Sequence, residues 1–266
     1  MSGPTDTWAE ADAYEHYVGR WSRPVATEFI AWLDVPQARA WLDVGCGTGA
    51  LSETIARQAS PTHLNALDAS PAYIAQARQH LAGTNARVVL GLAQQMPLRS
   101  QCFDAVVSAL ALNFVPVPEA AVSEMARVAR VGGLVAAYVW DYARGMQLMR
   151  CFWDAAVALD PVAAALDEGT RFSLCQPDRL EALFRECGLD DVESRAIDIP
   201  TRFVDFDDYW SPFLGAQGPA PGYAMSLNEE RRARLRDKIR RALPTAADGS
   251  IALTARAWAV RGRRSP

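Results

Sequence analysis

The chain is poor in the residues that build metal sites and disulfide frameworks. Its five cysteines are an odd number, and no two of them form a CxxC pair. Both observations argue against structural disulfides and against a structural zinc site. We therefore expect no bound metal and a location in the reducing cytoplasm. Lysine is rarer still, since Lys238 is the only one in the sequence.

An excess of positive charge and long apolar runs are also missing. The 27 basic residues face 31 acidic ones, so the formal net charge of −4 disfavours binding to nucleic acid or to anionic membranes. The basic cluster at 231–241 has helical spacing and follows two glutamates, which is typical of a solvated helix face. No stretch of about 18 apolar residues could span a bilayer, and the first 16 residues lack the pattern of a secretory signal. We expect a cytoplasmic protein, monomeric or homodimeric.

Short apolar segments alternate with helical patterns through the first half of the chain. The expected strands are 40–45, 63–69, 86–93, 103–110 and 134–140, and the expected helices include 23–33 and 118–130. This alternation predicts a parallel sheet covered by helices on both faces. Two later strands, 191–203 and 250–260, enclose a helical insertion and predict a hairpin that closes the sheet. With 50% hydrophobic residues, the chain can bury one large core, so we expect a single domain.

A glycine-rich turn follows the first expected strand in the segment "WLDVGCGTGAL". Glycine weakens both strands and helices, so three of them at this junction indicate that a ligand approaches the backbone closely. Asp68 stands 19 residues past Gly49, at the end of the next strand, where its carboxylate can accept hydrogen bonds from ribose hydroxyls. The spacing fits both the GxGxxG/A pattern of dinucleotide sites and a GxGxG pattern, so the residues alone leave the class of nucleoside ligand open.

Four segments together resemble the successive motifs of the S-adenosylmethionine-dependent methyltransferases with a Rossmann-like (class I) fold. They are "LDVGCGTG", "LDAS", "GLAQQMPLRSQCFDAVVSALALNFV" and "EMARVARVGGLVAAYVW", in the family's order and spacing over about residues 40–140. The lead-in "YEHYVGRWSRPVATEFIAWL" and the aromatic segment "FDDYWSPFLG" resemble a small-molecule methyltransferase subgroup. The resemblance implies an α/β fold with a seven-stranded, mostly parallel sheet whose last strand is antiparallel, and a helical cap from the N-terminus and the late insertion. It divides the domain 1–266 into a lead-in (1–35), a cofactor-binding core (40–140) and a part with cap helices and closing strands (141–266).

The resemblance also implies a set of residues that bind S-adenosylmethionine. Asp43 lies near the methionine amino group, the glycine turn lies against the cofactor, Asp68 holds the ribose, and Ala69 lies beside the adenine. An acidic residue usually follows the glycine equivalent to Gly91, but this chain has Leu92 there, so Ala93 or Gln94 is left to contact the adenine. The complete set is Asp43, Gly45, Cys46, Gly47, Gly49, Asp68, Ala69, Ala93, Gln94, Ser108 and Ala109, the last two near the transferred methyl group.

Candidates for catalysis and acceptor binding come from outside these motifs. His16, Asp141 and Tyr142 are the candidates for a general base, which a hydroxyl or acidic carbon acceptor would require. Residues expected to line the acceptor site are Tyr14, Tyr17, Asn113 and Trp210. The predicted partner is a small-molecule methyl acceptor that reacts by in-line displacement.

Two other functions remain open at this point. A nicotinamide-dependent (NAD) dehydrogenase would need a catalytic Tyr/Lys or His pair on the sheet rim, and the single lysine is far from the sheet motifs. A non-catalytic S-adenosylmethionine-binding protein would fit the missing acid at Leu92, and turnover of any acceptor would exclude it.

Overall fold

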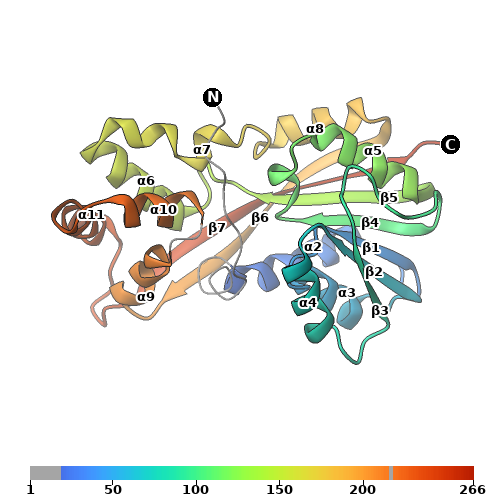
Figure 1. Cartoon of the computed structure of the whole chain (residues 1–266), viewed down its shortest axis with the longest axis horizontal. Coiled ribbons are helices and arrows are strands. Elements are labelled where there is room, and N and C mark those ends of the chain that lie inside the picture. The colour runs from blue at the N-terminus through green and yellow to red at the C-terminus, as the bar shows by residue number, and fades with distance from the viewer. Residues whose placement is uncertain (1–18, 216–217) are drawn as a thin grey trace. The chain divides into compact units, whose positions relative to one another are not determined.

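The computed structural model describes residues 19–215 and 218–266 (Figure 1). The described residues divide into two compact units. The core unit comprises residues 22–140, 174–197 and 257–266. The helical unit comprises residues 19–21, 141–173 and 198–256. The single domain expected from the sequence stays a prediction.

The strands form one seven-stranded sheet in the order β3-β2-β1-β4-β5-β7-β6. Strands β1 to β5 pair in parallel, whereas β7 pairs antiparallel to β5. This confirms the predicted mostly parallel sheet and the neighbouring positions of the two late strands. The strands are β1 (Ala40–Val44), β2 (His63–Asp68), β3 (Ala86–Leu90), β4 (Phe103–Ala109), β5 (Ala129–Trp140), β6 (Leu189–Phe203) and β7 (Ile251–Arg264).

Helices of the core unit cover both faces of its strands. Right-handed crossovers place the helices that follow β1 and β2 on one face and the helix that follows β4 on the other, because the strand order reverses between β1 and β4. Ligands of such sheets bind beyond the carboxyl ends of the strands at this reversal. The helices are α2 (Ser22–Leu33), α3 (Ala50–Gln58), α4 (Pro71–His80), α5 (Pro118–Val128) and α8 (Pro177–Glu186), with a short 3₁₀ turn, η2 (Leu112–Phe114).

Several predicted boundaries differ from those of the structure. The helix expected over 118–130 ends at Val128, and β5 begins at Ala129, five residues before the start of the strand expected at 134–140. Arg264, on the distant strand β7, donates hydrogen bonds to the carbonyls of Arg127 and Ala129 and so provides partners for the backbone at this junction. The strand expected over 86–93 ends at Leu90, because the chain turns at Gly91 to form a bridge between Leu92 and Gln95.

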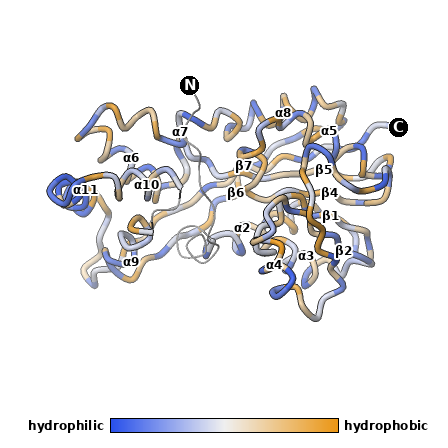
Figure 2. The backbone as a smooth tube through the Cα atoms, in the orientation of Figure 1, coloured by the Kyte–Doolittle hydropathy of each residue, from blue (hydrophilic) through white to orange (hydrophobic). Residues whose placement is uncertain are grey.

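The helical unit is built around aromatic side chains. Phe152 stacks on Phe213 with ring centroids 4.5 Å apart, and the Tyr209 hydroxyl donates to the carbonyl of Leu148 at 2.9 Å. Its elements are η1 (Gly19–Trp21), α6 (Gln147–Leu159), η3 (Pro161–Ala165), α7 (Glu168–Arg171), α9 (Phe206–Trp210), η4 (Ser211–Leu214), α10 (Pro219–Ser226) and α11 (Glu229–Ala242). Helix α11 contains the basic cluster and is hydrophilic over most of its length (Figure 2). Within residues 19–215 and 218–266, no helix has the length and apolar character needed to cross a membrane.

Candidate functional site

The glycine turn joins β1 to α3 in the core unit, as the sequence predicts. Gly45, Gly47 and Gly49 have φ values of 72°, 53° and 98°, which L side chains rarely adopt. A Cβ at Gly45 would lie 2.5 Å from the Cβ of Ala111, so this glycine is also required by packing. A Cβ at Gly47 would meet nothing within 4 Å, and the backbone there faces open space. The turn therefore offers an approachable backbone at the sheet edge where ligands of this fold bind.

Asp43 is fully buried at the end of β1, and only one of its two carboxylate oxygens has a partner. The Ser52 hydroxyl donates to Oδ2 at 2.7 Å, whereas Oδ1 is buried without a hydrogen bond. The pKa of this carboxyl is raised to about 7, chiefly by burial; the Ser52 hydrogen bond opposes the shift, and the nearby charge of Asp68 adds to it. A bound cation would compensate the buried oxygen, so Asp43 fits the ammonium group of a methionine moiety.

Asp68, at the end of β2, holds the glycine turn. The backbone N–H of Gly47 donates to Oδ2 at 2.9 Å, and that of Ser70 donates to Oδ1 at 2.8 Å. Ser70 itself accepts a hydrogen bond from Tyr73 N and thereby caps α4. Asp68 thus ties the turn after β1 to the helix that follows β2, and its half-buried carboxylate keeps lone pairs for further donors.

The segment after β3 lies beside β2 but lacks an acidic side chain. Gly91 N donates to the carbonyl of Asp68 at 2.9 Å, and a Cβ at Gly91 would lie 2.8 Å from Pro97 Cδ. Leu92 is 55% exposed, while Ala93 and Gln94 are half-buried. The exposed Leu92 leaves an apolar surface where the resemblance implies a hydrogen-bond acceptor. The predicted roles of Ala69, Ala93 and Gln94 toward adenine stay predictions.

The end of β4 forms the other wall of the turn. Ser108 is buried, and Leu110 has a positive φ of 55° while its N–H donates to the carbonyl of Tyr138 at 2.8 Å. This backbone kink brings Ala111 against Gly45. The side-chain nitrogen of Asn113 is buried without a partner. Ala111 is a site residue that the sequence reasoning missed, since only its smallness hinted at close packing.

Cys46 is an unreactive thiol within the turn. It is 6% exposed, and burial raises its pKa well above the ordinary range, with the charges of Asp43 and Asp68 adding to the shift. The thiol is therefore protonated near neutral pH, which argues against a nucleophilic role. The side chain packs within the turn, and the predicted position of Cys46 against the cofactor stays a prediction.

Three further candidates lie in the helical unit, where the structure gives each a local partner. Asp141 Oδ1 accepts from Arg144 N at 3.0 Å and so closes the turn after β5. Tyr142 packs its ring on Phe172, and Trp210 stacks on Phe206. Their catalytic or acceptor-binding roles stay predictions. Tyr14, His16 and Tyr17 lie outside the described residues.

Comparisons with known proteins find methyltransferases. Residues 42–137 match the family model described as a methyltransferase domain. The ubiquinone biosynthesis O-methyltransferase of Xylella fastidiosa (strain 9a5c) is 30% identical over 171 residues, which cover 62% of this chain and 67% of that enzyme. The 2-methyl-6-phytyl-1,4-hydroquinone methyltransferase 2 of Oryza sativa subsp. japonica is 29% identical over 124 residues, covering 46% of this chain but only 36% of the rice enzyme.

Among solved structures, the fold resembles that of phosphoethanolamine N-methyltransferase 2 of Haemonchus contortus, solved with S-adenosyl-L-methionine. The TM-score is 0.58 at 13% identity, over 96% of this chain and 57% of that one. The match to the Xylella enzyme, the family model and the glycine turn with its two aspartates lead to one assignment. The chain belongs to the S-adenosylmethionine-dependent methyltransferases with a Rossmann-like fold.

Proposed function

We propose that this protein transfers the methyl group of S-adenosylmethionine to a small-molecule acceptor. The observation that carries the proposal is the unpaired, fully buried Oδ1 of Asp43, four residues before the open backbone at Gly47. A buried carboxylate without a donor is costly unless a ligand compensates it. A cationic amino group held there, with the rest of the ligand along the glycine turn, supplies that compensation.

Each residue then has a role in holding the cofactor. Asp43 accepts from the amino group, and the turn from Gly45 to Gly49 lets the ligand lie against the backbone. Asp68 receives the ribose hydroxyls on its remaining lone pairs, while its bond to Gly47 N keeps the turn in place. We assign Ser108 and Ala109, at the end of β4, to the neighbourhood of the reacting methyl group.

Methyl transfer requires little of the protein beyond the alignment of donor and acceptor. A sulfonium donor is already activated, so holding donor and acceptor in line supplies most of the rate, and effective molarities of about 10⁵ M are attainable. A hydroxyl acceptor additionally needs a base, for which Asp141, Tyr142 and His16 are the candidates. The names of the relatives, which act in ubiquinone biosynthesis and on a hydroquinone, make phenolic hydroxyl compounds the first acceptors to try. We also propose a cytoplasmic location, because the five cysteines form no CxxC pair and are an odd number.

Calorimetric titration with S-adenosylhomocysteine and with NADH tests the cofactor assignment. We expect S-adenosylhomocysteine to bind and NADH not to bind; tighter binding of NADH would overturn the proposal. Incubation with labelled S-adenosylmethionine and a panel of phenols and quinols then tests turnover. Cofactor binding without transfer to any acceptor in a broad panel would favour a non-catalytic S-adenosylmethionine-binding protein instead.

A further inference from the structure

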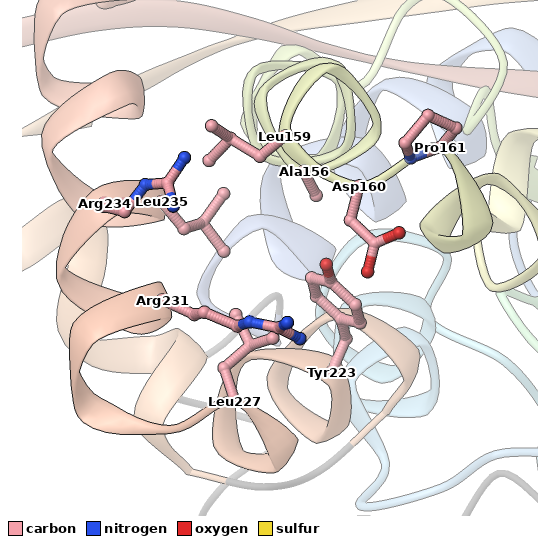
Figure 3. A pocket seen from close by; sticks show the side chains of 9 residues that line it. All are labelled: Ala156, Leu159, Asp160, Pro161, Tyr223, Leu227, Arg231, Arg234 and Leu235. Carbon is pink, nitrogen blue, oxygen red and sulfur yellow. The ribbon is translucent and has the colours of Figure 1, made fainter.

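The helical unit contains a cavity of about 270 Å³ that no step of the proposed transfer uses (Figure 3). Its walls come from the end of α6, the start of η3, the end of α10 and the first turns of α11. Cavities for drug-sized ligands measure about 300–1,000 Å³, so this one suits a small molecule. Its apolar lining consists of Ala156, Leu159, Pro161, Leu227 and Leu235.

Two arginines on α11 stand at this cavity. Arg231 and Arg234 are three residues apart and therefore share one face of the helix. Both are exposed, and neither guanidinium has an ion pair or hydrogen bond within the part of the chain that the structure describes. Arg232, between them, behaves differently, since it donates to the carbonyls of Ala224 and Leu227. The two cavity arginines are thus available to a ligand, whereas their neighbour has a structural role.

Tyr223 and Asp160 complete the polar lining. Figure 3 shows the Arg231 guanidinium and the Asp160 carboxylate directed toward the Tyr223 ring from opposite sides. Burial raises the pKa of the Tyr223 hydroxyl, the Asp160 charge raises it further, and Arg231 lowers it, so the hydroxyl is a neutral donor. Asp160 also accepts a hydrogen bond from Val162 N at 3.1 Å. Two guanidinium charges and one carboxylate leave a surplus of one positive charge.

We propose that this cavity binds a small amphipathic carboxylate, that is, one carboxylate on an aliphatic or aryl body. The carboxylate lies at Arg231 and Arg234, whose planar guanidiniums match a carboxylate in geometry. The apolar body lies against Leu159 and Leu235. A single negative charge balances the surplus, and Asp160 disfavours a dianion such as a phosphate monoester.

Three probes that share parts of this ligand test the proposal on the whole chain: octanoate, octan-1-ol and acetate. Tyr223 lies 5.7 Å from Trp153 between ring centroids, so tryptophan fluorescence reports occupancy, and calorimetry checks it. We expect octanoate to bind at least about tenfold more tightly than either other probe, since only octanoate contributes both charge and apolar area. Equal binding of octan-1-ol would mean that the site recognises only the apolar body, and equal binding of acetate would mean that it recognises only the charge. Octyl phosphate is titrated as a fourth compound, and its tighter binding would overturn the choice of a carboxylate.

Variants locate the binding and separate it from methyl transfer. Arg231→Gln and Arg234→Gln should each weaken octanoate binding by about threefold to tenfold, an effect limited by the exposure of both side chains. Leu159→Asp, at a 37% exposed position, should abolish detectable binding through repulsion. Arg241→Gln is the matched control, because Arg241 is exposed on the same helix but does not line the cavity. Affinity for S-adenosylhomocysteine should stay unchanged in all four variants, so this proposal can fail without the proposed function failing. Unchanged octanoate affinity in both arginine variants would overturn it.

Discussion

Gly47 and Asp68 are joined by a hydrogen bond of 2.9 Å, from the backbone N–H of the glycine turn to the carboxylate at the end of the neighbouring strand. The second oxygen of the same carboxylate accepts from Ser70 N at 2.8 Å. One side chain thus fixes the end of β1, the end of β2 and the start of α4. The shape of the candidate cofactor site therefore depends on Asp68.

Replacing Asp68 by Ala should therefore weaken S-adenosylhomocysteine binding by about tenfold to a hundredfold, because ribose contacts to a charged acceptor are worth about 1.5–3 kcal/mol. Calorimetric titration measures the change. Ser70→Ala removes the α4 cap without removing the carboxylate and is the control. If both variants bind S-adenosylhomocysteine as the wild type does, Asp68 has only a structural role.

Binding of S-adenosylhomocysteine should strengthen as pH rises through 7. Asp43 has a pKa raised to about 7 by burial, and its ionised form binds the ligand's ammonium group. Affinity should therefore rise by about tenfold from pH 6 to pH 8, as the carboxyl ionises in the free protein. Asp43→Asn should bind more weakly and lose this pH dependence. A dependence that persists in the Asn variant would assign it to another group.

The two glycines of the turn should respond differently to alanine. Gly45→Ala adds a Cβ 2.5 Å from that of Ala111, in addition to the strain of a positive φ, whereas Gly47→Ala adds only the strain. We expect Gly45→Ala to lower the free energy of unfolding by about 2–4 kcal/mol and Gly47→Ala by about 1–2 kcal/mol. Urea denaturation measures both. Ala111→Gly in the Gly45→Ala background should recover the steric part; if it recovers nothing, the contact is not the cause.

Because position 92 lacks an acidic side chain, introducing one there should increase the affinity for S-adenosylhomocysteine. Leu92→Asp should restore an acceptor for the adenine amino group and tighten S-adenosylhomocysteine binding by about 1 kcal/mol or more. Gln94→Ala is measured in parallel by the same titration. A loss from Gln94→Ala together with no gain at position 92 would show that Gln94 already makes the contact.

Glu168 should make the protein less stable in alkaline solution. This carboxyl is buried, its pKa is raised to about 8 by burial, and it accepts a hydrogen bond from Trp153 Nε1. A raised folded-state pKa contributes stability that is complete below about pH 4.5 and is lost as pH rises through about 8. Glu168→Gln should flatten the decline of the melting temperature between pH 6 and 9. Asp167→Asn, which breaks the ion pair with Arg150, should lower the melting temperature without flattening the decline.

The sequence alone determined the succession of strands and helices along the chain, and it predicted where the cofactor site lies. Strand and helix patterns are local, and so is the glycine turn, whose residues are close in the chain. The position of Asp68 at the next strand end follows from the parallel arrangement of β1 and β2, which the short alternating segments already require.

Only the tertiary structure decided what these residues contact. The Cβ of Ala111 excludes a side chain at Gly45, a partner from β7 sets the end of α5, and Asp43 Oδ1 is left without a donor. Each depends on segments far apart in the chain, whose approach no local pattern specifies. The cavity at Arg231 and Arg234 is of the same kind: the sequence predicted a solvated basic helix face, and only the packing of α6, α10 and α11 placed two of its arginines beside an apolar hollow.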